Sequence, residues 1–142
     1  MRPVPLIRTA SILTLILFAG HTIGSPWTPY QDGPAVALIR GMKSLHFPII
    51  GFSRSYWDFY QGFGLTISVM LLMFAAWLWQ VAGVAKQRPE VAKPLLGTSL
   101  VGFSAIAILD GFYFFAIPLA LSTAIAVSLA LAWASAGPAR PR

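Results

Sequence analysis

Four long apolar stretches, separated by short polar or proline-rich segments, dominate the pattern of the chain. They cover about residues 6–23, 59–85, 95–112 and 115–133. A helix needs about 20 predominantly apolar residues to cross the hydrocarbon core of a bilayer, and each stretch is near or above that length. The pattern predicts an all-α fold, in which residues 1–142 form a single integral membrane domain with four transmembrane helices in a bundle.

The first apolar stretch has a competing interpretation as a secretory signal peptide. Arg2 and Arg8 stand at its start, and a basic start followed by an apolar segment is typical of such peptides. The segment at its end, Gly20–Gly24, offers only a poor small-residue cleavage site. We therefore expect the stretch to be retained as a transmembrane helix.

Residues 24–58 form a long connection between the first two stretches, rich in proline, glycine and aromatic residues. Pro26 and Pro29 exclude a regular helix at its start, because proline lacks an N–H donor and clashes with the preceding turn. A short amphipathic run then follows Pro34 and ends at Pro48. It is too short to span a bilayer, and it predicts a helix that lies in the membrane interface or caps the bundle.

Composition supports a membrane location. The chain is 57% hydrophobic and only 10% charged, whereas soluble domains contain roughly 25% charged residues. A soluble protein of this length could not bury so much apolar surface. The chain contains no cysteine, which excludes disulfides, thiolate metal ligands and cysteine nucleophiles.

The net charge of +6 indicates orientation and not nucleic-acid binding, because most basic residues flank the apolar stretches. One side of the predicted topology carries seven of them, and the other side carries Arg40, Lys43 and Arg54. The seven are Arg2, Arg8, Lys86, Arg88, Lys93, Arg140 and Arg142. Since cytoplasmic loops are enriched in Lys and Arg, we expect a bacterial inner-membrane protein with both termini cytoplasmic, including the basic tail 137–142.

This topology brings three ionisable residues to the outer end of the predicted bundle. His21 ends the first helix, Asp58 opens the second and Asp110 ends the third. Ionisable residues at membrane depth are costly, and they usually face the bundle interior or water. We predict a polar pocket beneath the loop 24–58, with these ligand-binding candidates: His21, Arg54, Asp58, Gln61, Asp110 and Tyr113.

Several functions fit this cluster. Its residues favour a protein that binds a small amphiphile, a membrane lipid or a quinone-like molecule over an enzyme. As an alternative, His21 and Asp58 would act as base and orienter, and Asp110 as acid, in an isomerase-type reaction. No His-x-x-x-His or Glu-x-x-His spacing supports a metal site, and the sequence predicts no cofactor.

Structural roles explain the same three residues equally well. His21 would meet the negative end of a helix dipole. Asp58 would be the N-cap of the second helix, and Asp110 with Gly111 would form an ordinary turn.

The fourth stretch carries a small-residue strip, with one such residue at every fourth position: Ser122, Ala126, Ala130 and Ala134. Strips of this kind allow close packing between membrane helices. They are compatible with a homo-oligomer or with an accessory subunit of a larger membrane complex.

Two stretches also carry a family resemblance. They are Gly20-His21-Thr22-Ile23-Gly24, preceded by Arg8-Thr9-Ala10, and the segment Ser55–Leu65, which contains Trp57-Asp58-Phe59 and Gly62-Phe63-Gly64. Together they resemble a family of small uncharacterised bacterial four-helix membrane proteins. The resemblance covers the first two helices and their loop. It implies a membrane location and a four-helix fold, but no activity and no catalytic residue.

Overall fold

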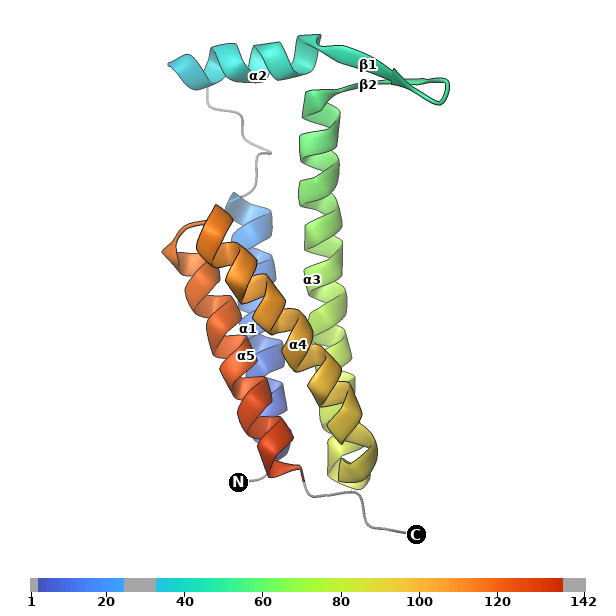
Figure 1. Ribbon diagram of the computed structural model, residues 1–142, viewed down its shortest axis with the longest axis vertical. Helices are drawn as coiled ribbons and strands as arrows, with labels where there is room; N and C mark the ends of the chain where they lie inside the picture. Colours follow the sequence, from blue (N-terminus) through green and yellow to red (C-terminus); the bar gives the residue numbers. More distant parts are fainter. Residues whose placement is uncertain (1–2, 25–32, 137–142) are drawn as a thin grey trace. The chain divides into compact units, whose positions relative to one another are not determined.

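The computed structural model describes residues 3–24 and 33–136, which form five helices and one two-stranded hairpin (Figure 1). The elements are α1 (Pro3–Gly24), α2 (Pro34–Ser44), β1 (His46–Ile49), β2 (Phe52–Ser55), α3 (Tyr56–Gln87), α4 (Pro89–Tyr113) and α5 (Ala116–Ser135). Four of the helices, α1, α3, α4 and α5, are long and apolar enough to cross a membrane. The all-α prediction is confirmed, and the protein is a multi-pass membrane protein.

The connection between α3 and α4 is shorter than the sequence suggested. Arg88 alone separates α3 from α4, whereas the predicted apolar stretches left residues 86–94 between them. Pro89 occupies the first turn of α4, where its missing N–H costs no hydrogen bond. Pro94 lies inside the helix, as membrane helices tolerate. The turn expected at Asp110 is also wrong, because α4 continues to Tyr113.

The hairpin β1–β2 was not predicted. Its antiparallel strands pair Phe47 with Arg54 and Ile49 with Phe52, and the backbone has positive φ at both turn residues, 46° at Ile50 and 81° at Gly51. Two positive φ values match a two-residue type I′ turn. Glycine adopts this conformation freely, but a β-branched residue there is strained by on the order of 1–3 kcal/mol.

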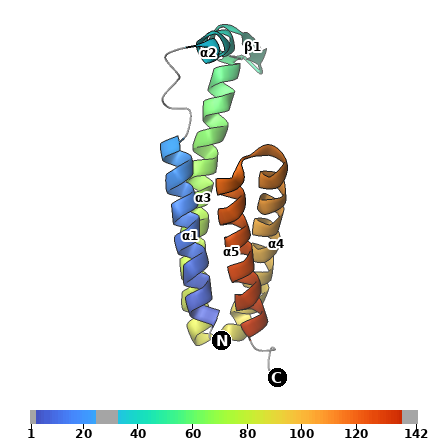
Figure 2. The same ribbon diagram turned by 90° about the vertical axis from the view of Figure 1, so that its left-hand side faces the viewer.

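The described residues divide into two compact units. We call residues 1–19 together with 71–142 the four-helix unit, and residues 20–70 the hairpin unit. In the four-helix unit, α1, the second half of α3, α4 and α5 lie side by side (Figures 1 and 2). Their facing sides form the hydrophobic core, whose fully buried large side chains are Ile7, Leu78, Leu96, Ile125, Leu129 and Val81.

A buried hydrogen bond links two helices of the four-helix unit. Ser11 Oγ of α1 donates to the backbone carbonyl of Ala75 in α3 over 2.7 Å. In a membrane, helices gain little from hydrophobic association, so packing and interhelical hydrogen bonds of this kind hold them together.

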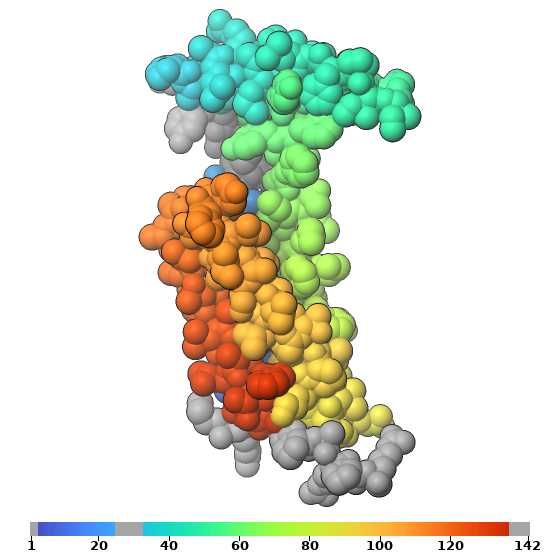
Figure 3. Space-filling model, in the orientation of Figure 1, coloured from blue at the N-terminus to red at the C-terminus, as the bar shows by residue number. Residues whose placement is uncertain are grey.

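The hairpin unit contains the end of α1, α2, the hairpin and the start of α3. The predicted amphipathic helix is present as α2, but it ends at Ser44, and Pro48 lies within β1. The Phe47 ring contacts the rings of Tyr56 and Phe59, with centroids 5.0 and 5.2 Å apart. As a result α2 and the hairpin lie across the start of α3, and their atoms form one continuous surface (Figures 1 and 3).

Candidate functional site

Asp58 has a structural role at the start of α3. Its carboxylate Oδ2 accepts a hydrogen bond from the Ser55 N–H over 2.8 Å, and the Asp58 N–H donates to Ser55 Oγ over 3.1 Å. This reciprocal pair has the geometry of a capping box, which satisfies backbone N–H groups that lack helical partners. Ser55 therefore takes the capping position that the sequence suggested for Asp58, and Asp58 is its partner one turn later.

His21 contacts a different part of α3. Its Nε2 lies 3.0 Å from the Gly64 carbonyl oxygen, and since a carbonyl can only accept, Nε2 donates the proton. One residue on, Thr22 Oγ1 donates to Ser68 Oγ over 3.0 Å. These contacts attach the end of α1 to α3 within the hairpin unit.

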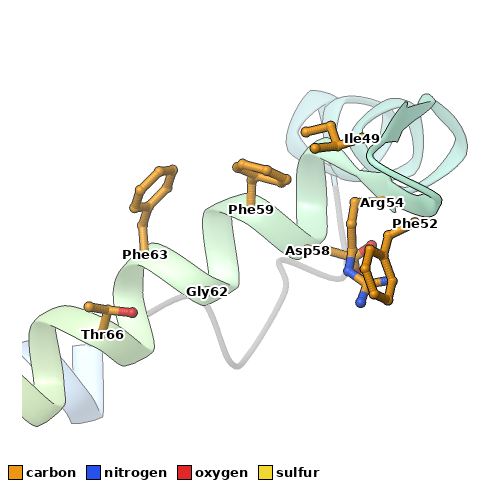
Figure 4. Close-up of a pocket in the computed structure, with 8 residues that line it drawn as sticks. All are labelled: Ile49, Phe52, Arg54, Asp58, Phe59, Gly62, Phe63 and Thr66. Carbon is orange, nitrogen blue, oxygen red and sulfur yellow. The ribbon is translucent and has the colours of Figure 1, made fainter.

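A groove of about 470 Å³ lies where the hairpin meets the first turns of α3. Figure 4 shows Phe59 and Phe63 projecting from α3 along one wall, with Arg54, Phe52 and Asp58 gathered near the start of the helix. Its lining residues are Ile49, Phe52, Arg54, Asp58, Phe59, Gly62, Phe63 and Thr66. The groove thus has a polar end beside the hairpin and an aromatic wall that runs along α3.

The polar end of the groove carries one positively and one negatively charged side chain. The Arg54 guanidinium lies 5.4 Å from the centroid of the Phe52 ring, and its Nη1 donates to the Ser53 carbonyl over 2.9 Å. A guanidinium carries five N–H donors, so this single bond leaves most of them for a ligand. The Asp58 carboxylate adds an acceptor, since Ser55 N–H bonds only its Oδ2.

The structure brings only some of the predicted site residues together. Arg54 and Asp58 both line the groove, whereas His21 and Gln61 do not. Gly64, the partner of His21, follows the groove residue Gly62 by two positions, which is about 200° around a helix. His21 therefore contacts the side of α3 that faces away from the groove, and its ring bonds a carbonyl and not Asp58.

Asp110 and Tyr113 belong to the four-helix unit. Tyr113 is largely exposed at the end of α4. Asp110 is only 7% exposed, and its Oδ2 has no hydrogen-bond partner among the described residues. A buried carboxylate oxygen without a partner is unusual, and such groups often mark functional positions in membrane proteins.

Sequence reasoning missed most of the groove wall. Phe59 and Phe63 are one helical turn apart and share a side of α3, but neither was among the ligand-binding candidates predicted from the sequence. Ile49 and Phe52 were missed because their contribution depends on the hairpin. The available signal was the repeat of Asp58, Gly62 and Thr66 at every fourth residue, with one phenylalanine beside each of the first two.

A second groove, of about 480 Å³, lies in the four-helix unit between α3 and α4. Its walls include Phe74 and Phe103, whose rings are 5.9 Å apart. The polar groups in it already have partners: Trp77 Nε1 donates to Ser99 Oγ over 3.3 Å, and Ser99 Oγ donates to the Leu95 carbonyl. This groove therefore presents an almost entirely apolar surface.

In residues 3–24 and 33–136, no three His, Asp or Glu side chains are placed to hold one metal ion. No protein-family model, no curated protein and no solved structure matches the chain.

Proposed function

We propose that the protein binds a small amphiphile, such as a lipid or a quinone-like molecule, in the groove between the hairpin and the start of α3. The observation that carries the proposal is the arrangement of one groove: Arg54 and Asp58 at one end, and the Phe59 and Phe63 rings along its wall. An amphiphile needs both surfaces at once. The polar end suits a headgroup, and the aromatic wall suits an apolar chain or ring.

Groove size and location support this proposal. A volume of about 470 Å³ falls within the range of roughly 300–1,000 Å³ that is typical of small-molecule sites. The groove follows the first three turns of a helix long enough to cross the bilayer, so a lipid-soluble ligand reaches it by lateral movement from the membrane. The edge-to-face contact of Phe59 and Phe63, with centroids 6.0 Å apart, keeps the wall ordered.

The proposed setting is the inner membrane of a bacterium, with both termini cytoplasmic and the groove at the outer surface. The support is the seven-to-three distribution of basic residues described above. We expect cysteine at Ser44, which is exposed on α2, to react with an impermeant thiol reagent added from outside. Cysteine at Gln87, at the other end of α3, should react only after the membrane is opened. The reverse pattern would show that the orientation is inverted.

The binding proposal is tested by filling the groove. Thr66→Trp places an indole inside it, whereas Ile67→Trp adds the same bulk at a neighbouring residue that does not line it. Native mass spectra of protein extracted in mild detergent should show a retained small-molecule mass on the wild type and on Ile67→Trp. Thr66→Trp should lose that mass, and Arg54→Gln should retain less of any ligand with an anionic headgroup.

Two results would contradict the proposal. One is a wild-type protein without any bound small molecule after extraction from its own membrane. The other is a bound mass that all four proteins retain equally, because the ligand would then lie outside the groove.

The isomerase-type reaction and the accessory-subunit role remain alternatives. We rank ligand binding above catalysis because the proposed catalytic pair does not form. The His21 ring bonds the Gly64 carbonyl, and the Asp58 carboxylate bonds the Ser55 N–H, so Asp58 does not orient His21 as a general base. An Asp58→Asn variant that retains the ligand but stops its turnover would favour catalysis. Co-purification of a second membrane protein in fixed proportion would favour an accessory subunit.

A further inference from the structure

The hairpin carries an apolar tip in an unfavourable place. Ile50 is 93% exposed, and Phe52, two residues later, is 63% exposed. Ile50 also has a φ of 46°, a conformation in which Asn, Asp or Gly is preferred in type I′ turns. A strained and exposed isoleucine stabilises neither the turn nor the hairpin in water. Contact of Ile50 with another molecule or surface therefore explains its presence better than the fold does.

Helix α2 continues this apolar surface. Leu38 and Leu45 are seven residues apart, share one side of the helix and are 66% and 60% exposed. Other apolar residues of α2, among them Ile39 and Met42, are half-buried. The helix is therefore apolar over more than the side that it packs against its own unit, which is typical of helices that lie in a membrane interface.

Basic residues lie on the same two elements as these apolar positions. The Arg54 guanidinium is beside the Phe52 ring, whereas Arg40 and Lys43 lie about 140–200° around α2 from Leu38. Arg40, Lys43 and Arg54 are exposed, and Asp58, the one acidic residue described in the hairpin unit, is held in the cap by Ser55. The unit thus presents cations and apolar side chains on the same elements. This combination complements a membrane surface that contains anionic lipids, because the headgroups attract the cations and the interface takes up the apolar groups.

The length of α3 brings this surface to the headgroups. With 32 residues and a rise of about 1.5 Å per residue, α3 is about 48 Å long. A bilayer with its headgroup layers is roughly 40–45 Å thick, so an α3 that crosses it begins near the outer edge of the headgroup layer. β2 leads directly into Tyr56, the first residue of α3, which places the hairpin at the same depth.

We propose that α2 and the hairpin form a membrane-docking surface that rests on the bilayer around the start of α3. Ile50 and Phe52 enter the interface at the hairpin tip, and Leu38 and Leu45 enter it along α2. Arg40 and Lys43 lie at anionic headgroups. This surface shares Phe52 with the groove, but Ile50 and the residues of α2 lie outside the groove lining. The surface would therefore exist even if the groove stayed empty.

The test uses the absence of native cysteine. Single cysteines at Ile50 and at Ser53 are labelled with an environment-sensitive fluorophore, and the full chain is reconstituted into vesicles of phosphatidylcholine with phosphatidylglycerol. Ser53 pairs with Pro48 and so lies on the other face of the hairpin from Phe52. Because Ile50 is 93% exposed, the substitution removes almost no packing.

We expect the label at Ile50 to be quenched by lipids that carry a nitroxide near the headgroup, and to be several-fold less accessible to aqueous iodide than the label at Ser53. Leu38→Cys and Ser44→Cys form a second matched pair on α2, with the same expected contrast. Replacing Arg40 and Lys43 by glutamine should reduce the shielding of Ile50 in vesicles with phosphatidylglycerol.

Three outcomes would overturn the proposal. Equal iodide accessibility at Ile50 and Ser53 would place the tip in water. Shielding in native membranes but not in purified lipids would indicate a protein partner in place of the bilayer. Shielding that does not depend on phosphatidylglycerol would remove the role assigned to the basic residues.

Discussion

Substituting Ser55 by alanine tests whether the cap at the start of α3 holds the groove together. The Ser55 side chain is 3% exposed, and its Oγ accepts the Asp58 N–H at 3.1 Å. Loss of a capping serine typically costs about 1 kcal/mol, within a range of roughly 0.5–2. The remainder of α3 stays helical because the cost falls on its first turn. Since about 1.4 kcal/mol corresponds to a factor of ten, local opening of that turn should become roughly fivefold more frequent.

Hydrogen exchange measured by mass spectrometry reports this opening directly. In lipid nanodiscs, the peptide that covers residues 53–60 should exchange about fivefold faster in Ser55→Ala than in the wild type, while peptides from the rest of α3 stay unchanged. Ser53→Ala is the matched control, because it removes an exposed hydroxyl from the same hairpin. Asp58→Asn should have a smaller effect, since its amide oxygen can still accept the Ser55 N–H.

One result would refute the reasoning behind this prediction. Unchanged exchange in Ser55→Ala would mean that the reciprocal hydrogen bonds contribute nothing to the start of the helix. Loss of a bound amphiphile from Asp58→Asn without faster exchange would leave the cap intact, and it would show that the Asp58 carboxylate contacts the headgroup directly.

Three further predictions concern the helices. Ser11→Ala removes a buried interhelical hydrogen bond. In a denaturant titration it should lower the free energy of unfolding by about 0.6 kcal/mol, and by at most about 2 kcal/mol. The control Ser128→Ala should leave the free energy of unfolding unchanged, because the Ser128 hydroxyl bonds a carbonyl of its own helix. Ala126→Leu overfills a position packed against the core, and it should lower the free energy of unfolding by about 1–3 kcal/mol in the same assay. Its control, Val127→Leu at an exposed position, should leave the free energy of unfolding unchanged. His21→Ala should weaken the attachment of α1 to α3, seen as faster exchange at the end of α1, but it should leave amphiphile binding intact because His21 does not line the groove.

The four long helices were predictable because the bilayer restricts which secondary structures can cross it. A chain in hydrocarbon must satisfy its backbone hydrogen bonds internally, so an apolar stretch of the right length is almost always a helix. Helix ends were less predictable. Pro89 and Pro94 lie between the second and third apolar stretches, and yet both are accommodated in α4. Proline is compatible with the first turn of a helix, and the sequence alone does not show which proline occupies it.

The hairpin could not be predicted from its sequence, and the groove depends on it. Its turn has Ile-Gly where Asn-Gly or Asp-Gly would signal a type I′ turn, and Pro48 argues against a strand. Both strands of an isolated pair are edge strands, so a proline is tolerated there. Because the hairpin was missed, Ile49 and Phe52 could not be assigned to the groove with Arg54.

The predicted cluster also shows why counting residues along membrane helices does not by itself define a site. Counting gives an approximate depth, and it placed His21 and Asp58 together at the outer end of the bundle. Within the hairpin unit, His21 bonds Gly64, six residues after Asp58, which is about 9 Å along the helix and about 120° around it. The angle around the axis is set by which side chains pack against which helix, and here the Gly64 carbonyl and Ser68 form the contact with α1. The opposite side of α3 remains for the groove, so the attachment of α1 determines which residues of α3 are available to a ligand.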